Sequence, residues 1–266
     1  MIKVGFIGAG NMGSALAKAT VKNTDTCVYV YDKDEDKAKK IAGDIGAEFK
    51  SNEYIAKECH YIFLAVKPNI IKAVAKEIST VVAGRKNFAI VSMAAGVCIE
   101  AIENAFSNPS LPIIRIMPNT PVGVGKGLTL WCKNKNVTDE AACGFEKIME
   151  HSGRVDAISE KLIDAASAVS GCGPAFVYMF IEALADGGVE CGLPRDKALL
   201  YACETLIGAA ETVKESGKHP EELKDAVCSP GGSTIAGVHA LEEGAFRASA
   251  ANAVKAAYQK TLALGK

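Results

Sequence analysis

The feature that most constrains the fold is a glycine-rich loop close to the N-terminus. The loop follows an apolar run at residues 3–7 that predicts a strand, and it opens a helical pattern at residues 12–22. Its residues are Gly8, Ala9, Gly10, Asn11, Met12 and Gly13. In such a strand–loop–helix unit, the first glycine permits a tight turn, the second lets the backbone approach a diphosphate, and the third lets the helix pack closely on the strand. We therefore predict a dinucleotide-binding loop; the alternative is a turn with a purely structural role.

Short apolar runs alternate with amphipathic segments over the first part of the chain. The runs that predict strands cover residues 3–7, 27–31, 61–66, 88–93, 113–117 and 128–131. Because strands that alternate with helices form parallel sheets, we expect an α/β fold with a Rossmann-like, doubly wound, mainly parallel sheet. We place this dinucleotide-binding domain at residues 1–159.

The second part of the chain has a different pattern. From about residue 160 the strand-like runs stop, and the sequence becomes rich in Ala, Leu, Glu and Lys. We predict an all-helical domain over residues 160–266 that serves dimerisation and substrate binding. The helix predicted at residues 174–191 is apolar on most faces, which indicates burial against a second subunit. We therefore expect a homodimer formed through the helical domain.

An acidic residue follows the second predicted strand at the distance that dinucleotide-binding units use. Asp32 lies 19 positions after Gly13, where a carboxylate accepts hydrogen bonds from the adenosine ribose. This carboxylate favours NAD over NADP because it repels a 2′-phosphate, although the adjacent Lys33 offsets part of the repulsion. A role for Asp32 as a turn or helix-cap residue stays open. The choice between NADH and NADPH stays open with it.

A second glycine turn opens the helix predicted at residues 235–242. The turn comprises Ser229, Pro230, Gly231, Gly232, Ser233 and Thr234. Its glycines leave the first N–H groups of the helix, those of Gly232, Ser233 and Thr234, facing outward, where they suit a carboxylate. The alternative is a capped turn in which a hydroxyl of Ser233 or Thr234 satisfies these backbone groups.

The residue types that are missing restrict the chemistry further. None of the four histidines lies in a metal-ligand or nucleophile motif, and no basic residue lies between Lys161 and Arg195. A dehydrogenase that acts on an alcohol needs a general acid or base, so this absence disfavours alcohol and ketone substrates. A protonated imine is already electrophilic and needs only a positioned hydride donor and an oriented nitrogen. The hydroxyl of Thr234 provides that orientation, and we predict Thr234 as the catalytic residue and no metal.

Composition disfavours several classes of partner. The formal net charge is −1, with 30 basic and 31 acidic residues interspersed, which argues against a nucleic-acid partner. Nine cysteines without a CxxC pair indicate reduced thiols. The N-terminus begins on a strand pattern rather than a signal peptide, and the longest apolar stretch, residues 174–185, is too short for a bilayer. We expect a cytoplasmic protein without a membrane partner.

Seven motifs together resemble those of the pyrroline-5-carboxylate reductases over nearly the whole chain. They are GAGNMG at residues 8–13, AVKP at 65–68, AAGV at 94–97, MPNTP at 117–121, SGCGPAF at 170–176, ALADGGVECGLPR at 183–195 and SPGGSTIAGV at 229–238. The resemblance implies the last step of proline biosynthesis. In that reaction a hydride passes from the nicotinamide of NAD(P)H to Δ1-pyrroline-5-carboxylate and gives L-proline.

The same resemblance assigns residues to the site. It implies that Thr234 hydrogen-bonds the ring nitrogen and that Ser229, Gly231, Gly232 and Ser233 surround the substrate carboxylate. The residues it adds to the cofactor site are Asn52, Ala65, Val66, Lys67, Pro68, Ala94 and Asn119. It further implies a site that the N-terminal domain of one subunit and the helical domain of another build together, in a homodimer that some members assemble into a decamer.

Two positions depart from the usual pattern of these reductases. Many members have Ser where this chain has Cys172, which is a near-isosteric change. Many also have a small polar residue or Asn, followed by Arg or Ser, where this chain has Asp32 and Lys33. The second departure puts the usual NADPH preference of the family in doubt.

Two other functions stay open at this point. A β-hydroxyacid dehydrogenase shares the two-domain plan and a similar glycine loop, but it lacks the SPGGST turn and carries an interdomain lysine that is missing here. A non-catalytic dinucleotide sensor that dimerises through its helical domain is the other. Retention of both AVKP and the turn with Thr234 argues against a sensor.

Overall fold

The computed structural model describes residues 1–264, so residues 265 and 266 of the predicted helical domain lie outside the described residues. Contacts divide the chain into two compact units. The first contains Met1–Cys172 and the end of helix α12 (Phe246–Leu264) from Ala257 on, and the second contains Gly173–Ala256. This division is a property of packing, and the boundary between functional domains at residue 159 stays a prediction.

The first unit is built on an eight-stranded sheet with the order β3-β2-β1-β4-β5-β6-β7-β8. The strands are β1 (Ile2–Ile7), β2 (Thr26–Tyr31), β3 (Glu48–Phe49), β4 (Tyr61–Leu64), β5 (Ala89–Ser92), β6 (Ile113–Pro118), β7 (Gly127–Lys133) and β8 (Gly153–Ala157). Every neighbouring pair is parallel except β6 and β7. The first six strands follow the order of a dinucleotide-binding fold, so the predicted mainly parallel, doubly wound sheet is confirmed.

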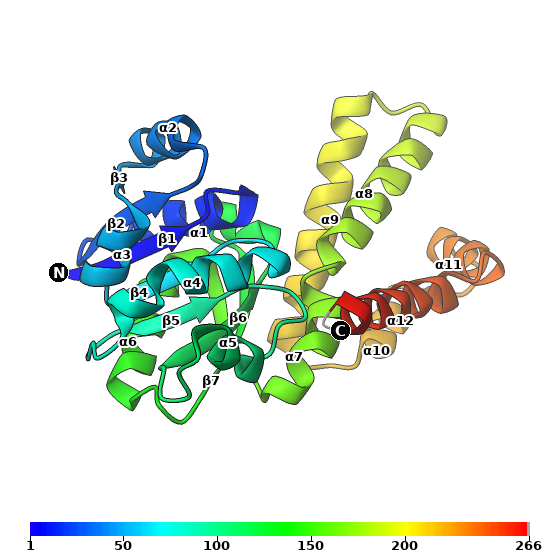
Figure 1. Cartoon of the computed structure of the whole chain (residues 1–266). Helices are drawn as coiled ribbons and strands as arrows, with labels where there is room; N and C mark the ends of the chain where they lie inside the picture. Colours follow the sequence, from blue (N-terminus) through cyan, green and yellow to red (C-terminus); the bar gives the residue numbers. More distant parts are fainter. Residues whose placement is uncertain (265–266) are drawn as a thin grey trace. The chain divides into compact units, whose positions relative to one another are not determined.

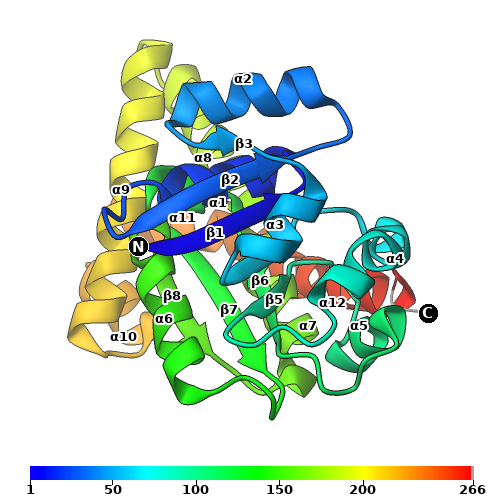
Figure 2. The same cartoon turned by 60° about the vertical axis from the view of Figure 1, so that its left-hand side comes forward.

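Helices cover both faces of this sheet, as Figures 1 and 2 show. They are α1 (Asn11–Thr20), α2 (Glu35–Ile45), α3 (Asn52–Glu58), α4 (Ile71–Val82), α5 (Ile99–Phe106), α6 (Asp139–Met149) and α7 (Glu160–Ser170). Helices α1, α2 and α6 contribute to one hydrophobic cluster, and α3, α4 and α5 contribute to another. Strands between two such layers are buried on both faces, which explains the unbroken apolar run of β4.

Short 3₁₀ turns and polar caps complete the connections. The turns are η1 (Pro68–Ile70), η2 (Thr120–Val124) and η3 (Glu150–Ser152). Asp34 accepts a hydrogen bond from the Lys37 N–H at 3.0 Å, and Thr138 accepts one from the Ala141 N–H at 3.2 Å. These side chains begin α2 and α6 because they satisfy N–H groups that the helices leave free.

Strands β3 and β8 were not predicted from the sequence. The first has only two residues, and the second alternates apolar positions with Arg154 and Asp156 at the edge of the sheet. Neither has the apolar run by which the other strands were recognised. The antiparallel pair of β6 and β7 joins β8 to the parallel part of the sheet.

The second unit is helical, which confirms the predicted change of architecture. Its helices are α8 (Gly173–Glu190), α9 (Arg195–Ser216), α10 (Pro220–Ala226), α11 (Ser233–Glu243) and the first part of α12. Helices α8 and α9 lie side by side around the buried alanines Ala185, Ala198 and Ala202 (Figure 1). Large apolar side chains on the same helices stay exposed, among them Tyr178 and Met179 at 57% and 70%. An isolated chain therefore leaves much of this apolar surface uncovered.

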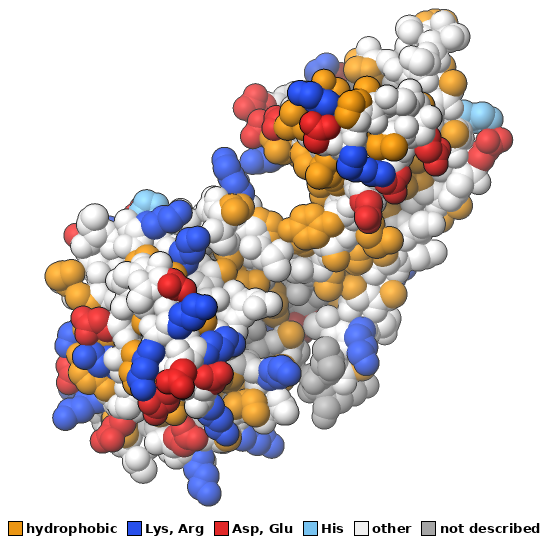
Figure 3. Space-filling view, turned by 90° about the horizontal axis from the view of Figure 1, so that it is seen from above, with side chains coloured by type: hydrophobic (Ala, Val, Ile, Leu, Met, Phe, Trp, Pro, Cys, Tyr) orange, Lys and Arg blue, Asp and Glu red, His pale blue; other side chains and the backbone are white. Residues whose placement is uncertain are grey.

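Hydrophobic side chains also gather in patches on the face drawn in Figure 3. Lysine, arginine, aspartate and glutamate side chains are interspersed on that face.

By length and composition, the stretch Glu160–Glu190 is apolar enough to cross a membrane. The expectation from the sequence considered only residues 174–185, a shorter stretch, and therefore missed this one. Its first part is α7, where Ile163 packs with Met117 and Leu130 of the sheet. The α7 part of this apolar stretch therefore belongs to the core of the first unit.

Candidate active site

The glycine loop joins β1 to α1, and its three glycines meet different physical demands. Gly8 has φ +110°, and a Cβ there would lie 2.4 Å from the backbone oxygen of Ala65. A Cβ on Gly13 would lie 2.4 Å from the oxygen of Gly8. A Cβ on Gly10 would meet nothing within 4 Å. Gly8 and Gly13 are thus required by the fold itself, whereas the fold leaves open space beside Gly10.

The N-terminus of α1 has the properties of an anion site. Gly10 is the cap residue and has no side chain to satisfy the first N–H groups of the helix. Uncapped N–H groups at a helix N-terminus, together with the helix dipole, favour a negatively charged group such as a diphosphate. The open space beside Gly10 lets such a group approach the backbone.

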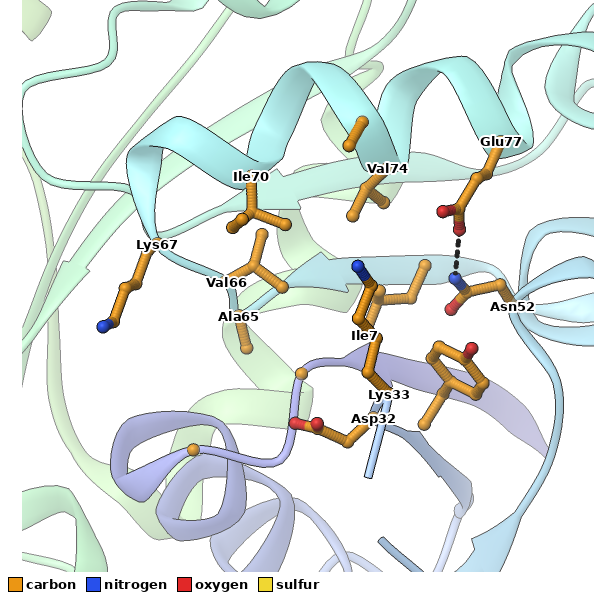
Figure 4. A pocket seen from close by; sticks show the side chains of 14 residues that line it. Ile7, Asp32, Lys33, Asn52, Ala65, Val66, Lys67, Ile70, Val74 and Glu77 are labelled. Atoms are coloured by element: carbon orange, nitrogen blue, oxygen red, sulfur yellow. Dashed lines mark hydrogen bonds between the residues drawn. The ribbon is translucent and has the colours of Figure 1, made fainter. Parts of the chain in front are cut away.

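A pocket of about 280 Å³ opens beside this loop, at the carboxyl ends of β1, β2 and β4 (Figure 4). This is where the strand order reverses, because β1 has β2 on one side and β4 on the other. In open α/β sheets, ligands bind at this crevice. The residues that line it are Ile7, Gly8, Gly10, Tyr31, Asp32, Lys33, Asn52, Ala65, Val66, Lys67, Ile70, Ala73, Val74 and Glu77. The structure therefore brings eight of the predicted cofactor residues together in one pocket.

Asp32 has both a structural and a potential ligand-binding role. Its Oδ2 accepts a hydrogen bond from the Ala9 N–H at 2.7 Å, and its Oδ1 accepts one from the Asp34 N–H at 3.2 Å. The first hydrogen bond fixes the glycine loop. The second forms a turn at residues 32–34, which is the structural role that the sequence had left open for Asp32. An ionised carboxylate has about four acceptor positions, so two bonds leave capacity for a ribose hydroxyl.

Several lining residues were not predicted from the sequence. Tyr31 ends β2, while Ile70, Val74 and Glu77 come from η1 and α4, which follow the AVKP motif. Burial, with further contributions from Glu77, Glu35 and Asp32, raises the pKa of Tyr31. The phenol therefore stays neutral at pH 7. The helical spacing of Ile70 and Val74 was visible in the sequence, but it indicated only a buried helix face.

Seven predicted cofactor residues do not line the pocket. They are Ala9, Asn11, Met12, Gly13, Pro68, Ala94 and Asn119. Asn119 has a structural role, because its Nδ2 donates to the Ser170 oxygen at 3.0 Å and its Oδ1 accepts from the Leu128 N–H at 2.8 Å. Ala94 is buried in the turn after β5. Their contact with a cofactor stays a prediction.

The second glycine turn lies in the helical unit and opens α11. Gly231 has φ +68°, a backbone conformation that favours glycine, and a Cβ on Gly232 would lie 2.5 Å from the Ser229 Oγ, so that side chain would have to turn away. One expectation was wrong: the Gly232 N–H does not face outward freely, because it donates to the Ser229 oxygen at 3.0 Å. Among the described residues no side chain caps α11. The alternative interpretation, a turn capped by a hydroxyl of Ser233 or Thr234, is therefore not observed. The N–H groups of Ser233 and Thr234 are the ones that stay available.

The cysteine thiols are free among residues 1–264, and these residues contain no cluster of His, Cys, Asp or Glu that could hold a metal ion. Burial raises the pKa of Cys59 to about 12 and that of Cys132 to about 11. Both thiols therefore stay protonated and unreactive at neutral pH.

Exchange of one glycine separates the binding role of the loop from its folding role. Gly10→Ala is expected to leave stability within about 1 kcal/mol, because Gly10 has ordinary extended backbone angles and free space around it. The same methyl group occupies the space that a diphosphate needs, so we expect NADH affinity to fall ~10- to 100-fold. Calorimetric titration and thermal unfolding measure the two effects.

Gly8→Ala is the matched control. Its methyl group collides with the Ala65 oxygen, so this variant is expected to lose stability in addition to NADH affinity. Unchanged NADH affinity in Gly10→Ala would show that no diphosphate approaches this loop.

Comparison with protein families gives two matches. The family described as "Pyrroline-5-carboxylate reductase dimerisation" matches residues 160–264. The family described as "NADP oxidoreductase coenzyme F420-dependent" matches residues 3–96. The second match covers the glycine loop and all of the residues that line the pocket.

Individual proteins are similar over nearly the whole chain. A pyrroline-5-carboxylate reductase of Arabidopsis thaliana is 38% identical over 99% of this chain and 96% of its own. One from Escherichia coli is 38% identical over 99% and 98%. Among solved structures, the Plasmodium falciparum pyrroline carboxylate reductase with NADP bound is 36% identical, covers 100% of this chain and 98% of its own, and has a TM-score of 0.90.

Proposed function

Because the chain belongs to the pyrroline-5-carboxylate reductase family, we propose that it reduces Δ1-pyrroline-5-carboxylate to L-proline, the last step of proline biosynthesis. The enzyme is an oxidoreductase that acts on a C=N bond with NAD(P)H as reductant. The observation that carries this conclusion is 38% identity over 99% of the chain with reductases of that name. The dinucleotide pocket at the point where the strand order reverses supports it.

The residues of the pocket fit a nicotinamide dinucleotide. The uncapped start of α1 and the space beside Gly10 suit the diphosphate, and Asp32 and Asn52 suit the adenosine ribose. The bound nicotinamide would supply the hydride. The residues we assign to the cofactor are Gly8, Ala9, Gly10, Asn11, Met12, Gly13, Asp32, Lys33, Asn52, Ala65, Val66, Lys67, Pro68, Ala94 and Asn119.

The second glycine turn is assigned to the substrate. The free N–H groups of Ser233 and Thr234 at the start of α11 suit the carboxylate of pyrroline-5-carboxylate. Gly231 and Gly232 hold the turn, and Ser229 lies against Gly232. The Thr234 hydroxyl orients the ring nitrogen, which stands next to the carbon that bears the carboxylate. The turn thus provides both the anion site and the orienting group that imine reduction needs.

The helical region, which matches the dimerisation family from residue 160 to 264, forms a homodimer. Dimerisation covers exposed apolar side chains such as Tyr178 and Met179. We place the functional boundary between residues 1–159 for the dinucleotide and residues 160–266 for dimerisation and substrate. Association of dimers into a decamer and a cytoplasmic location complete the proposal.

Initial rates test the assignment against its alternatives. Purified protein is expected to oxidise NADH or NADPH when pyrroline-5-carboxylate is added and to form proline in equal amount. Oxidation of 3-hydroxyisobutyrate without turnover of pyrroline-5-carboxylate would instead identify a β-hydroxyacid dehydrogenase. Rates equal to background with both substrates would leave only a dinucleotide sensor.

A further inference from the structure

One side chain in the pocket, Asn52, is oriented by a carboxylate that no sequence motif contains. Asn52 is the first residue of α3, and its Nδ2 donates to the Oε2 of Glu77 from α4 at 2.8 Å. An ionised carboxylate only accepts hydrogen bonds, so the chemistry of Glu77 decides which end of the Asn52 amide faces it. Figure 4 shows the result: the amide nitrogen points to Glu77, and the oxygen points away from it.

The Asn52 Oδ1 is buried and has no hydrogen-bond donor among the described residues. A buried acceptor without a donor is costly, and such a group in a native protein calls for an explanation. In a pocket, the simplest explanation is a ligand that brings a donor. Because Glu77 holds the nitrogen, Asn52 presents only an acceptor to that ligand.

The two carboxylates at this end of the pocket, those of Asp32 and Glu77, have the same preference for a donor. Asp32 keeps acceptor positions after its two backbone hydrogen bonds, and Glu77 has a second oxygen. Lys33 lines the same end, and its side chain extends into the pocket in Figure 4. This end therefore presents two carboxylates, one amide oxygen and one cation.

A ribose 2′-hydroxyl and a 2′-phosphate differ in what they offer to these groups. The hydroxyl donates a hydrogen bond, whereas the phosphate is an anion that mainly accepts. A phosphate facing Asp32, Glu77 and the Asn52 Oδ1 meets two like charges and an acceptor, and only Lys33 attracts it. The hydroxyl satisfies an acceptor without introducing charge.

We propose that Glu77 is a specificity-determining residue: by orienting Asn52, it makes the ribose end of the pocket accept a hydroxyl and so favours NADH over NADPH. The proposal rests on the proposed function, in which this pocket binds the dinucleotide. It assigns cofactor specificity to a residue of α4 that contacts Asn52, in addition to Asp32, which follows β2. Asp32, after β2, and Glu77, on α4, thus favour the same cofactor from different elements.

Binding measured without substrate tests the proposal. Calorimetric titration of the full chain is expected to show tighter binding of NADH than of NADPH by ~10-fold or more, since a mismatched charge or donor costs at least one power of ten. Glu77→Gln places an amide beside Asn52 that donates as well as accepts, so Asn52 can turn its nitrogen to the ligand. The NADH-to-NADPH affinity ratio is expected to fall by ~10-fold in this variant.

Glu53→Gln is the matched control, because Glu53 is exposed, follows Asn52 directly on α3 and does not line the pocket. It removes the same charge without touching the amide, so the affinity ratio is expected to stay as in the parent protein. Titration with AMP and with adenosine 2′,5′-bisphosphate repeats the comparison without the nicotinamide half.

The outcomes separate this proposal from the function on which it rests. Equal affinity of the parent protein for NADH and NADPH would overturn the proposal, and so would an affinity ratio in Glu77→Gln that matches the ratio in Glu53→Gln. In both cases the dinucleotide still binds, so the proposed reductase function stands. Binding of neither dinucleotide would overturn both.

Discussion

Thr234→Ala is expected to lower the rate of pyrroline-5-carboxylate reduction by ~10- to 1000-fold, because the variant lacks the hydroxyl that we propose orients the ring nitrogen. Affinity for NADH and NADPH is expected to stay within a few-fold, since the pocket that binds them lies in the other unit of the chain. Steady-state rates and calorimetric titration of the cofactor measure the two quantities separately.

Thr234→Ser is the matched control because it keeps a hydroxyl at the same position. It is expected to retain most of the turnover, whereas loss of a methyl group alone would affect Ser and Ala variants alike. The backbone N–H group of residue 234 is present in all three proteins, so the anion site that we propose at the start of α11 keeps its donors. Turnover of Thr234→Ala equal to that of the parent protein would remove Thr234 from the mechanism.

Arg115→Ala is expected to destabilise the first unit by about 3 kcal/mol or more, the cost of breaking a buried ion pair. Arg115 lies on β6 with its side chain 2% exposed, and it contacts the Asp164 Oδ1 at 2.6 Å and the Glu160 Oε1 at 3.3 Å, both on α7. The same Glu160 oxygen accepts the Ile99 N–H at 2.7 Å. The arginine therefore connects β6, α7 and the start of α5, and its loss leaves two carboxylates without their cation.

The midpoint of urea-induced unfolding measures this loss, with the slope of the transition checked for change. Arg154→Ala is the control, since Arg154 on β8 is 74% exposed and 3.7 Å from its partner Asp156. Removal of such an exposed pair is expected to change stability by less than about 1 kcal/mol. Equal midpoints for the two variants would show that the buried arginine does not hold α7 to the sheet.

Much of the first unit follows from local sequence patterns. The run at residues 3–7, the three glycines and Asp32 predicted a strand, a dinucleotide-binding loop and a second strand that ends at Asp32. The structure brings the ends of these strands together in one pocket. This succeeds because each glycine meets a local demand: Gly8 a positive φ, Gly13 a close contact and Gly10 an open space. Parallel order then places the ends of neighbouring strands at one edge of the sheet.

What could not be predicted depends on contacts between distant segments. Glu77 and Asn52 are 25 residues apart, and only the packing of α3 beside α4 brings them together. Asn119 belongs to a motif that suggested the cofactor, yet both ends of its amide hold backbone groups of other elements. Likewise, the hydrogen bond from Gly232 to Ser229 depends on the exact path of the turn. Sequence patterns indicate the residue types of a site, while hydrogen bonds between distant segments of the chain decide which atoms stay available to a ligand.

Transfer of deuterium from the cofactor to the product tests the central claim most directly. With NADH deuterated at both C4 positions, the L-proline formed from pyrroline-5-carboxylate is expected to carry one deuterium at C5, which mass spectrometry detects. Proline without deuterium, or no proline at all while the protein binds NADH, would contradict the claim that this chain reduces the C=N bond by hydride transfer.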